Sequence, residues 1–210
     1  MRHQHARAAC VALAICGMAA AAEISVWTET ATRRVLREAP PGSTREVRLQ
    51  AARGEWEGFQ VLVRSAVPIA GLDLAVSAFS GPDGAAIPAE GVQCYRQHQF
   101  EISRPSFRND AFTPGWYPDG LIPFRHPLTG QPLPEARLRA VPFDLPAEQT
   151  HGFYLDVPVP ETAPAGEYQA TVTLTAADAV RVEVPVRLTV WGFTLPAVPS
   201  YQTAFGAPAK

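Results

Sequence analysis

Pairs of carboxylates are the first residues in this sequence that could carry out chemistry. Hydrolysis of a glycoside needs two carboxyl groups across the scissile bond, or one acid and a residue that orients a substrate acetamide. No two acidic residues are adjacent in the chain. Glu55 and Glu57 flank Trp56, and in a strand this spacing places both carboxylates on one face. Charged residues lie mostly at the surface, so we interpret this pair as a solvated strand edge.

Metal-binding and nucleophile motifs are missing from the sequence. His98, His126 and His151 are far apart, and neither a C-x-x-C nor an H-x-x-x-H spacing occurs. The motifs G-x-S-x-G and G-x-G-x-x-G are also absent. Cys94 stands beside Tyr95 in an apparent strand, where we expect a small buried side chain. We therefore predict no catalytic residue, no metal site and no cofactor for this chain.

The segment 115–123, GWYPDGLIP, is the remaining candidate for contact with another molecule. Its content of Trp, Tyr, Pro and Gly predicts neither a helix nor a regular strand, but a loop stiffened by its prolines. Trp116 and Tyr117 could stack on a sugar ring while Asp119 accepts hydrogen bonds from hydroxyl groups. The same aromatic side chains suit docking against a neighbouring domain, because Trp and Tyr are enriched in interface cores. We favour the domain interface and keep ligand contact as the alternative.

Residues 1–22 have the layout of a secretory signal peptide, with a basic start, a short apolar middle and four alanines. The apolar part is shorter than the about 20 residues that a membrane-spanning helix needs. Cleavage near Ala22 leaves Cys94 as the one cysteine, so no internal disulfide is expected. It also leaves 16 Lys and Arg against 20 Asp and Glu, a net charge of −4 that argues against a nucleic-acid partner. We expect a periplasmic or extracellular protein with no membrane attachment after signal cleavage.

Residues 180–190 show the clearest periodicity, because every second residue is Val or Leu and the residues between are Arg, Glu, Pro and Thr. This alternation predicts a strand with one buried and one solvent-exposed face. Pro185 lies on the exposed face and lacks an N–H, which predicts an edge position or a bulge. Residues 167–174 alternate in the same way, and the short connection between the two segments predicts an antiparallel hairpin.

Further strands with the same pattern are expected at 46–51, 59–63, 72–78, 92–102 and 150–157. Turn signals such as GPDG separate them, and no segment carries the sustained apolar stripe of a helix. We predict an all-β fold, an antiparallel β-sandwich of immunoglobulin-like or jelly-roll type that spans residues 23–195. A long proline-rich loop region is expected at 103–146, and residues 196–210 are expected to be a linker and the start of a second domain.

Three stretches of the sequence carry a resemblance to a known family. They are ARGEWEGFQVLV at 52–63, WYPDGLIP at 116–123, and PAGEY at 164–168 with VWGFTLP at 190–196. In order and spacing they resemble the N-terminal domain of glycoside hydrolase family 123 and its uncharacterised relatives. Gly54 and Gly192 stand where the family more usually has Asn and Asp. The resemblance covers nearly all of the chain after the signal peptide.

The resemblance implies a non-catalytic β-sandwich followed by a (β/α)-barrel, in which an adjacent Asp-Glu pair supports substrate-assisted hydrolysis of β-linked N-acetylgalactosamine. We expect the chain to be truncated before that barrel, with 201–206 as its first strand. The absent barrel is then the expected partner, and no activity is expected from this chain alone. Two other hypotheses stay open: a stand-alone carbohydrate-binding module that uses the 103–146 loop, and an immunoglobulin-like adhesion or scaffold domain.

Overall fold

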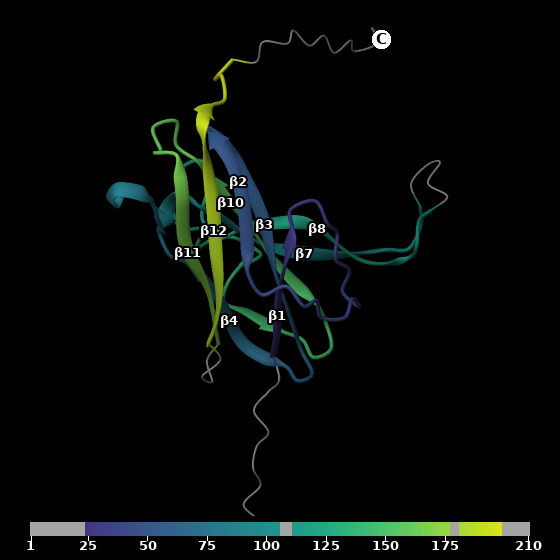
Figure 1. The fold of residues 1–210 in the computed structure, drawn as a ribbon. Coiled ribbons are helices and arrows are strands. Elements are labelled where there is room, and N and C mark those ends of the chain that lie inside the picture. Colours follow the sequence, from purple (N-terminus) through teal and green to yellow (C-terminus); the bar gives the residue numbers. More distant parts are fainter. Residues whose placement is uncertain (1–23, 106–110, 177–180, 199–210) are drawn as a thin grey trace, which may run out of the picture.

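The computed structural model describes residues 24–105, 111–176 and 181–198. Two β-sheets face each other across one large hydrophobic core, which confirms the predicted all-β sandwich (Figure 1). The described part has two short 3-10 helices, η1 (Pro82–Gly84) and η2 (Ala89–Gly91). Neither is long and apolar enough to cross a membrane. The expected signal peptide at 1–22 lies outside the described residues, and so does the expected linker and second-domain start at 196–210, apart from residues 196–198.

The strands divide into a five-stranded and a seven-stranded sheet. The five-stranded sheet has the order β1 (Ile24–Thr30), β3 (Trp56–Ser65), β10 (His151–Pro158), β7 (Gln93–Ile102), β8 (Gly115–Pro123). The seven-stranded sheet has the order β2 (Val47–Arg53), β12 (Arg181–Thr194), β11 (Gly166–Thr175), β4 (Ile69–Val76), β9 (Phe143–Leu145), with β5 (Phe79–Ser80) and β6 (Ala86–Ile87) beside β11. The predicted hairpin of β11 and β12 is antiparallel, whereas β2 runs parallel to β12.

The alternation along β12 builds the core as the sequence predicts. Val184, Val186, Leu188 and Val190 are buried, and the residues between them point away from the core. Fully burying a side chain of this kind stabilises the fold by roughly 1.5–3 kcal/mol relative to leaving it exposed.

Pro185 was predicted at an edge or a bulge, but it lies on an interior strand, just before the stretch of β12 that pairs with β2. It faces Thr171 on β11, and the pairing of β12 with β2 begins only at Val186. Thr171 directs its own backbone N–H and C=O to Ser77, on the side away from β12. The nitrogen of Pro185 therefore faces the side where β2 has not yet begun, and no ladder hydrogen bond is lost there.

The outer face of the five-stranded sheet is partly covered by residues 31–46, the covering segment, which joins β1 to β2. Trp27 and Leu62 point to this outer face and form a second, small core with Val35 of the covering segment. As a result, Val26, Trp27 and Thr28 of β1 are all buried. β1 was not predicted from the sequence, because a strand covered on both faces shows no alternation between apolar and polar residues.

The segment GWYPDGLIP is a strand, so the prediction of a loop at 115–123 is wrong. It forms β8, the edge of the five-stranded sheet, and pairs antiparallel with β7. His98 pairs with Gly120 and Gln99 with Pro118, so Asp119 is the extra residue of a β-bulge. An edge strand with a bulge tolerates a proline that an interior strand would not.

Candidate functional site

The site residues expected from the sequence lie on a two-stranded extension of the five-stranded sheet. β10 pairs with β7 at residues 93–96, so within the described ranges residues 97–102 of β7 pair with β8 alone. We call residues 97–102 and 115–120 the arm. Figure 1 shows the β7–β8 hairpin reaching out from the body of the sandwich. The covering segment is the second element that positions its side chains.

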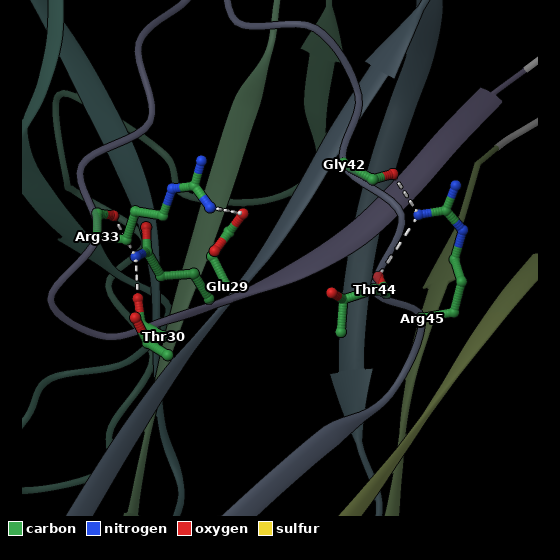
Figure 2. A network of polar contacts seen from close by, with 7 residues as sticks. Glu29, Thr30, Arg33, Gly42, Thr44 and Arg45 are labelled. Carbon is green, nitrogen blue, oxygen red and sulfur yellow. Dashed lines mark hydrogen bonds and ion pairs between the residues drawn. The ribbon is translucent and has the colours of Figure 1, made fainter.

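Both ends of the covering segment are fixed by local polar contacts, which Figure 2 shows. At its start, Arg33 forms an ion pair with Glu29 at 3.0 Å and donates its backbone N–H to the carbonyl of Thr30 at 3.2 Å. Near its end, Arg45 donates from Nη1 to the carbonyl of Gly42 at 2.7 Å. These contacts hold the segment in a defined path across the sheet.

Side-chain amides under the covering segment tie its middle to the sheet. Gln60 donates from Nε2 to the carbonyl of Thr30 at 2.6 Å, and Gln97 donates to Oε1 of Gln60 at 2.6 Å. Gln99 donates to the carbonyl of Thr150 at 2.7 Å, and Thr150 donates from Oγ1 to the carbonyl of Ala39 at 2.7 Å. All four of these side chains are buried, so each lost hydrogen bond would leave a desolvated polar group.

Arg37 of the covering segment lies directly on Trp116. Its guanidinium carbon is 3.5 Å from the centre of the indole ring, a cation–π contact, and its Nε donates to Oε1 of Gln99 at 2.5 Å. The amide network therefore sets where Arg37 lies, and Arg37 in turn covers one face of the Trp116 ring. A sugar cannot stack on that face unless the arginine first moves away.

Tyr117 and Asp119 have different surroundings from Trp116. The Tyr117 ring stacks on Phe112 with centroids 6.0 Å apart, and its hydroxyl donates to the carbonyl of Thr113 at 2.5 Å. Asp119 is exposed at the bulge. Trp116 pairs with Glu101 and Tyr117 with Phe100, and consecutive strand residues point to opposite faces. An arginine of the covering segment nevertheless lies over each ring, because the guanidinium carbon of Arg34 is 5.6 Å from the centre of the Tyr117 ring.

We expect Arg37→Ala to lower the free energy of unfolding by about 1–2 kcal/mol, because it removes the cation–π contact and leaves Oε1 of Gln99 without its donor. The indole N–H resonance of Trp116 should shift at the same time. Arg33→Ala is the matched control, because the Arg33 side chain is 67% exposed and its ion pair with Glu29 should contribute less than about 1 kcal/mol. Equal stability of the two variants would contradict this role of Arg37.

The acidic pair considered from the sequence does not form on one strand. Glu55 lies in the turn before β3, and its carboxylate accepts the backbone N–H of Ala52 at 2.7 Å. Glu57 lies within β3, where burial, then Glu55 and then Asp156 raise its pKa. No group of three or more His, Cys, Asp or Glu side chains among the described residues could hold a metal ion.

A second exposed aromatic group lies at the end of β12, where the chain leaves the sandwich (Figure 1). Trp191, Phe193 and Leu195, the exit group, are 39%, 53% and 41% exposed. The two aromatic rings stack with centroids 5.6 Å apart, and Arg53 donates from Nη2 to the backbone carbonyl of the intervening residue Gly192 at 2.7 Å. These residues were not among the site residues expected from the sequence. The sequence does contain a signal for this group, because Trp191 and Phe193 occupy positions that the alternation along β12 predicts to face solvent.

Among known proteins, similarity to this chain is found in solved structures. No protein-family model matches the sequence, and no curated protein matches it. A family 123 glycoside hydrolase from Clostridium perfringens, analysed for glycolipid glycan hydrolysis, has a TM-score of 0.64 at 11% identity over 82% of this chain and 28% of that chain. This likeness is one of fold. The described sandwich resembles a part of that glycoside hydrolase, of which the chain spans well under a third.

Two other solved structures are similar to a lower degree. The N-terminal domain of PorA has a TM-score of 0.32 at 10% identity, over 80% of this chain and 99% of that chain. A beta-glucosidase from Listeria innocua has a TM-score of 0.30 at 13% identity, over 83% of this chain and 17% of that chain. Scores this low add no argument about function.

Proposed function

We propose that this chain provides the non-catalytic N-terminal β-sandwich of an exported glycoside hydrolase-like protein of the family 123 type. Its partner in this proposal is a catalytic (β/α)-barrel of the same protein, active on β-linked N-acetylgalactosamine. The motifs at 52–63, 116–123, 164–168 and 190–196 support the family, and so does the fold that the chain shares with a family 123 enzyme. The layout of residues 1–22, which is that of a secretory signal peptide, supports export.

The observation that carries the proposal is the exit group. Trp191 and Phe193 are large apolar side chains on the solvent face of a strand whose other solvent-facing residues are charged or small. Neighbouring exposed aromatic rings of this kind are typical of a surface that another domain covers. They lie at the end of β12, where the chain leaves the sandwich, so a domain that follows β12 is well placed to cover them.

The arm supplies a second surface for the same domain interface. Phe100 is 47% exposed, and Trp116 and Tyr117 are held by stacking contacts from Arg37 and Phe112. Rings held in place lose little conformational entropy when a partner covers them. The alternative role of the arm, as the site of a stand-alone carbohydrate-binding module, gains less support because Arg37 already occupies one face of Trp116.

The proposal is tested by extending the expressed protein into the reading frame that follows codon 210. We expect that frame to encode a (β/α)-barrel with an adjacent Asp-Glu pair, and the extended protein to hydrolyse a chromogenic β-N-acetylgalactosaminide. The 210-residue chain should release no chromophore under the same conditions. Turnover by the chain alone, or a stop codon followed by unrelated sequence, would overturn the proposal.

A further inference from the structure

A cavity of about 410 Å³ opens at one edge of the sandwich, where β1 ends the five-stranded sheet and β2 ends the seven-stranded sheet. This volume falls within the range of small-molecule sites, about 300–1,000 Å³. Both ends of the covering segment contribute to its wall, through Ala31 and Thr32 at the start and Thr44 and Glu46 at the end. The cavity includes no residue of the arm or of the exit group.

The surface inside the cavity is largely apolar. Phe59 of β3 and Val47 and Leu49 of β2 belong to the hydrophobic core and line the cavity. Glu57 precedes Phe59 by two residues, so the alternation along β3 directs its carboxylate to the same side, between the two sheets. The cavity thus combines an apolar floor with a carboxylate that the core-facing side of a strand supplies.

The other carboxylates of the lining are neutralised by arginine side chains. Glu29 forms an ion pair with Arg33 at 3.0 Å, and Glu46 forms one with Arg48 at 2.7 Å. Glu29 also lies on the outer face of β1, since it is the cross-strand partner of Gln60 in the amide network. These two carboxylates therefore leave the charge inside the cavity to Glu57.

Glu57 has no counter-charge of its own. It takes part in no ion pair within the described ranges of the chain. Burial, then the carboxylates of Glu55 and Asp156, raise its pKa, and no neighbouring cation lowers it. A carboxylate in such surroundings is stabilised by a cation that comes within hydrogen-bond distance. The charge in the cavity therefore favours a positively charged ligand.

The edge of β1 beside the cavity is already paired, which favours a small ligand over a peptide strand. The backbone N–H of Thr28 donates to the carbonyl of Thr44 at 3.0 Å, and its Oγ1 donates to the carbonyl of Glu46 at 2.8 Å. A peptide that adds to a sheet needs a row of free backbone N–H and C=O groups. The end of the covering segment takes that place at Thr28.

We propose that this cavity binds a small alkylamine, with the ammonium group at the Glu57 carboxylate and the alkyl chain against Phe59 and Leu49. Thr30, the cross-strand partner of Phe59, adds a hydroxyl acceptor for the ammonium donors. A neutral apolar ligand would desolvate the Glu57 carboxylate without a counter-charge, and an anion would be repelled by it. A metal ion lacks ligands there, because the described residues hold no suitable group of three.

The inference is tested by titrating the ¹⁵N-labelled chain with n-butylammonium chloride at constant ionic strength. We expect saturable shifts of the backbone amide resonances of residues 47–49 and 57–59, with a dissociation constant of about 1–10 mM. The matched neutral ligand is n-butanol, which should bind about tenfold more weakly because it lacks the charge-assisted hydrogen bond. Equal affinity for the two ligands, or no saturable shifts with about 50 mM butylammonium, would overturn the proposal.

Variants assign the charge to Glu57. Glu57→Gln should weaken butylammonium binding about tenfold and leave butanol binding unchanged. Its side chain is only partly buried and has no ion pair to lose, so the variant is expected to fold. Glu183→Gln is the control, because its carboxylate pairs with Arg181 on the solvent face of β12, and it should keep the wild-type dissociation constant. Full butylammonium affinity in Glu57→Gln would contradict the proposal.

A lysine peptide separates a free amine from a protein partner. Acetyl-Gly-Lys-Gly-amide carries the same ammonium group on a backbone, and we expect it to bind no more tightly than butylammonium, because the edge at Thr28 is already paired. Tighter binding of the peptide at the same resonances would make the cavity a docking site for a protein and overturn the proposal. These outcomes do not depend on the domain that follows the sandwich.

Discussion

We expect the Tyr168→Ala variant to lose about 4 kcal/mol of its free energy of unfolding, because removing a buried aromatic ring leaves a cavity in the core. Tyr168 is fully buried on β11. Its ring packs closely against Gly81, where an added Cβ would come within 2.2 Å of it. Its hydroxyl donates to the carbonyl of Pro164 at 3.0 Å and so closes the PAGEY turn from within. Urea unfolding followed by circular dichroism measures the loss.

Tyr168→Phe is the matched control, because it keeps the ring and removes only the hydroxyl. It should cost about 1 kcal/mol, the net contribution of one ordinary hydrogen bond. If the alanine variant instead stayed within about 1 kcal/mol of the wild type, the ring would not fill the core as described. A total stability of 5–15 kcal/mol is usual for a domain, so a 4 kcal/mol loss is a large part of it.

The fold could be predicted where only one face of a strand is buried. β11 and β12 show this, because their solvent faces up to Thr189 are polar apart from Pro185 and their core faces are apolar. β1 could not be found in this way, since the covering segment buries Trp27 from the outer side. β8 was misread for another reason. Its prolines argue against an interior strand, but the sequence does not reveal which strand lies at an edge or carries a bulge.

The candidate site was predictable only in part. The aromatic residues of GWYPDGLIP stand out by composition, whereas the contacts that define their surroundings come from distant segments. Arg37 and Trp116 are 79 residues apart in the sequence. Only the folded chain places the guanidinium on the indole ring. The exit group differs, because Trp191 and Phe193 break the polar face of β12 in the sequence itself. An apolar residue at a position predicted to be exposed is therefore the more useful signal of a covered surface.

Acid should destabilise this protein through His151, which lies on β10 and is 8% exposed. Its Nε2 lies 3.1 Å from Oε1 of Gln149, an acceptor, so Nε2 carries the proton and the buried Nδ1 is left without a partner. Burial, then Arg37, Arg96 and His98, lower the pKa of His151 from 6.5 to about 4. The guanidinium groups of Arg37, in the covering segment, and Arg96, on β7, thus oppose protonation of this imidazole.

The pH window follows from these two pKa values. Between pH 6.5 and pH 4 the unfolded chain binds a proton at His151 that the folded chain does not, so stability present above pH 6.5 falls as the pH falls. From pH 7.5 to pH 4.5 we expect His151 to account for a loss of about 2 kcal/mol.

His151→Gln removes this titration while keeping a polar group that can reach Gln149. Between pH 7.5 and pH 4.5 its free energy of unfolding should therefore fall by about 2 kcal/mol less than that of the wild type. His126→Gln, in the loop after β8, serves as the control and should keep the wild-type acid sensitivity. Urea unfolding at the two pH values measures all three proteins. Only a group that binds protons differently in the folded and unfolded states can make stability depend on pH. If His151→Gln lost as much stability in acid as the wild type, the carboxylates and not this buried imidazole would cause the acid destabilisation.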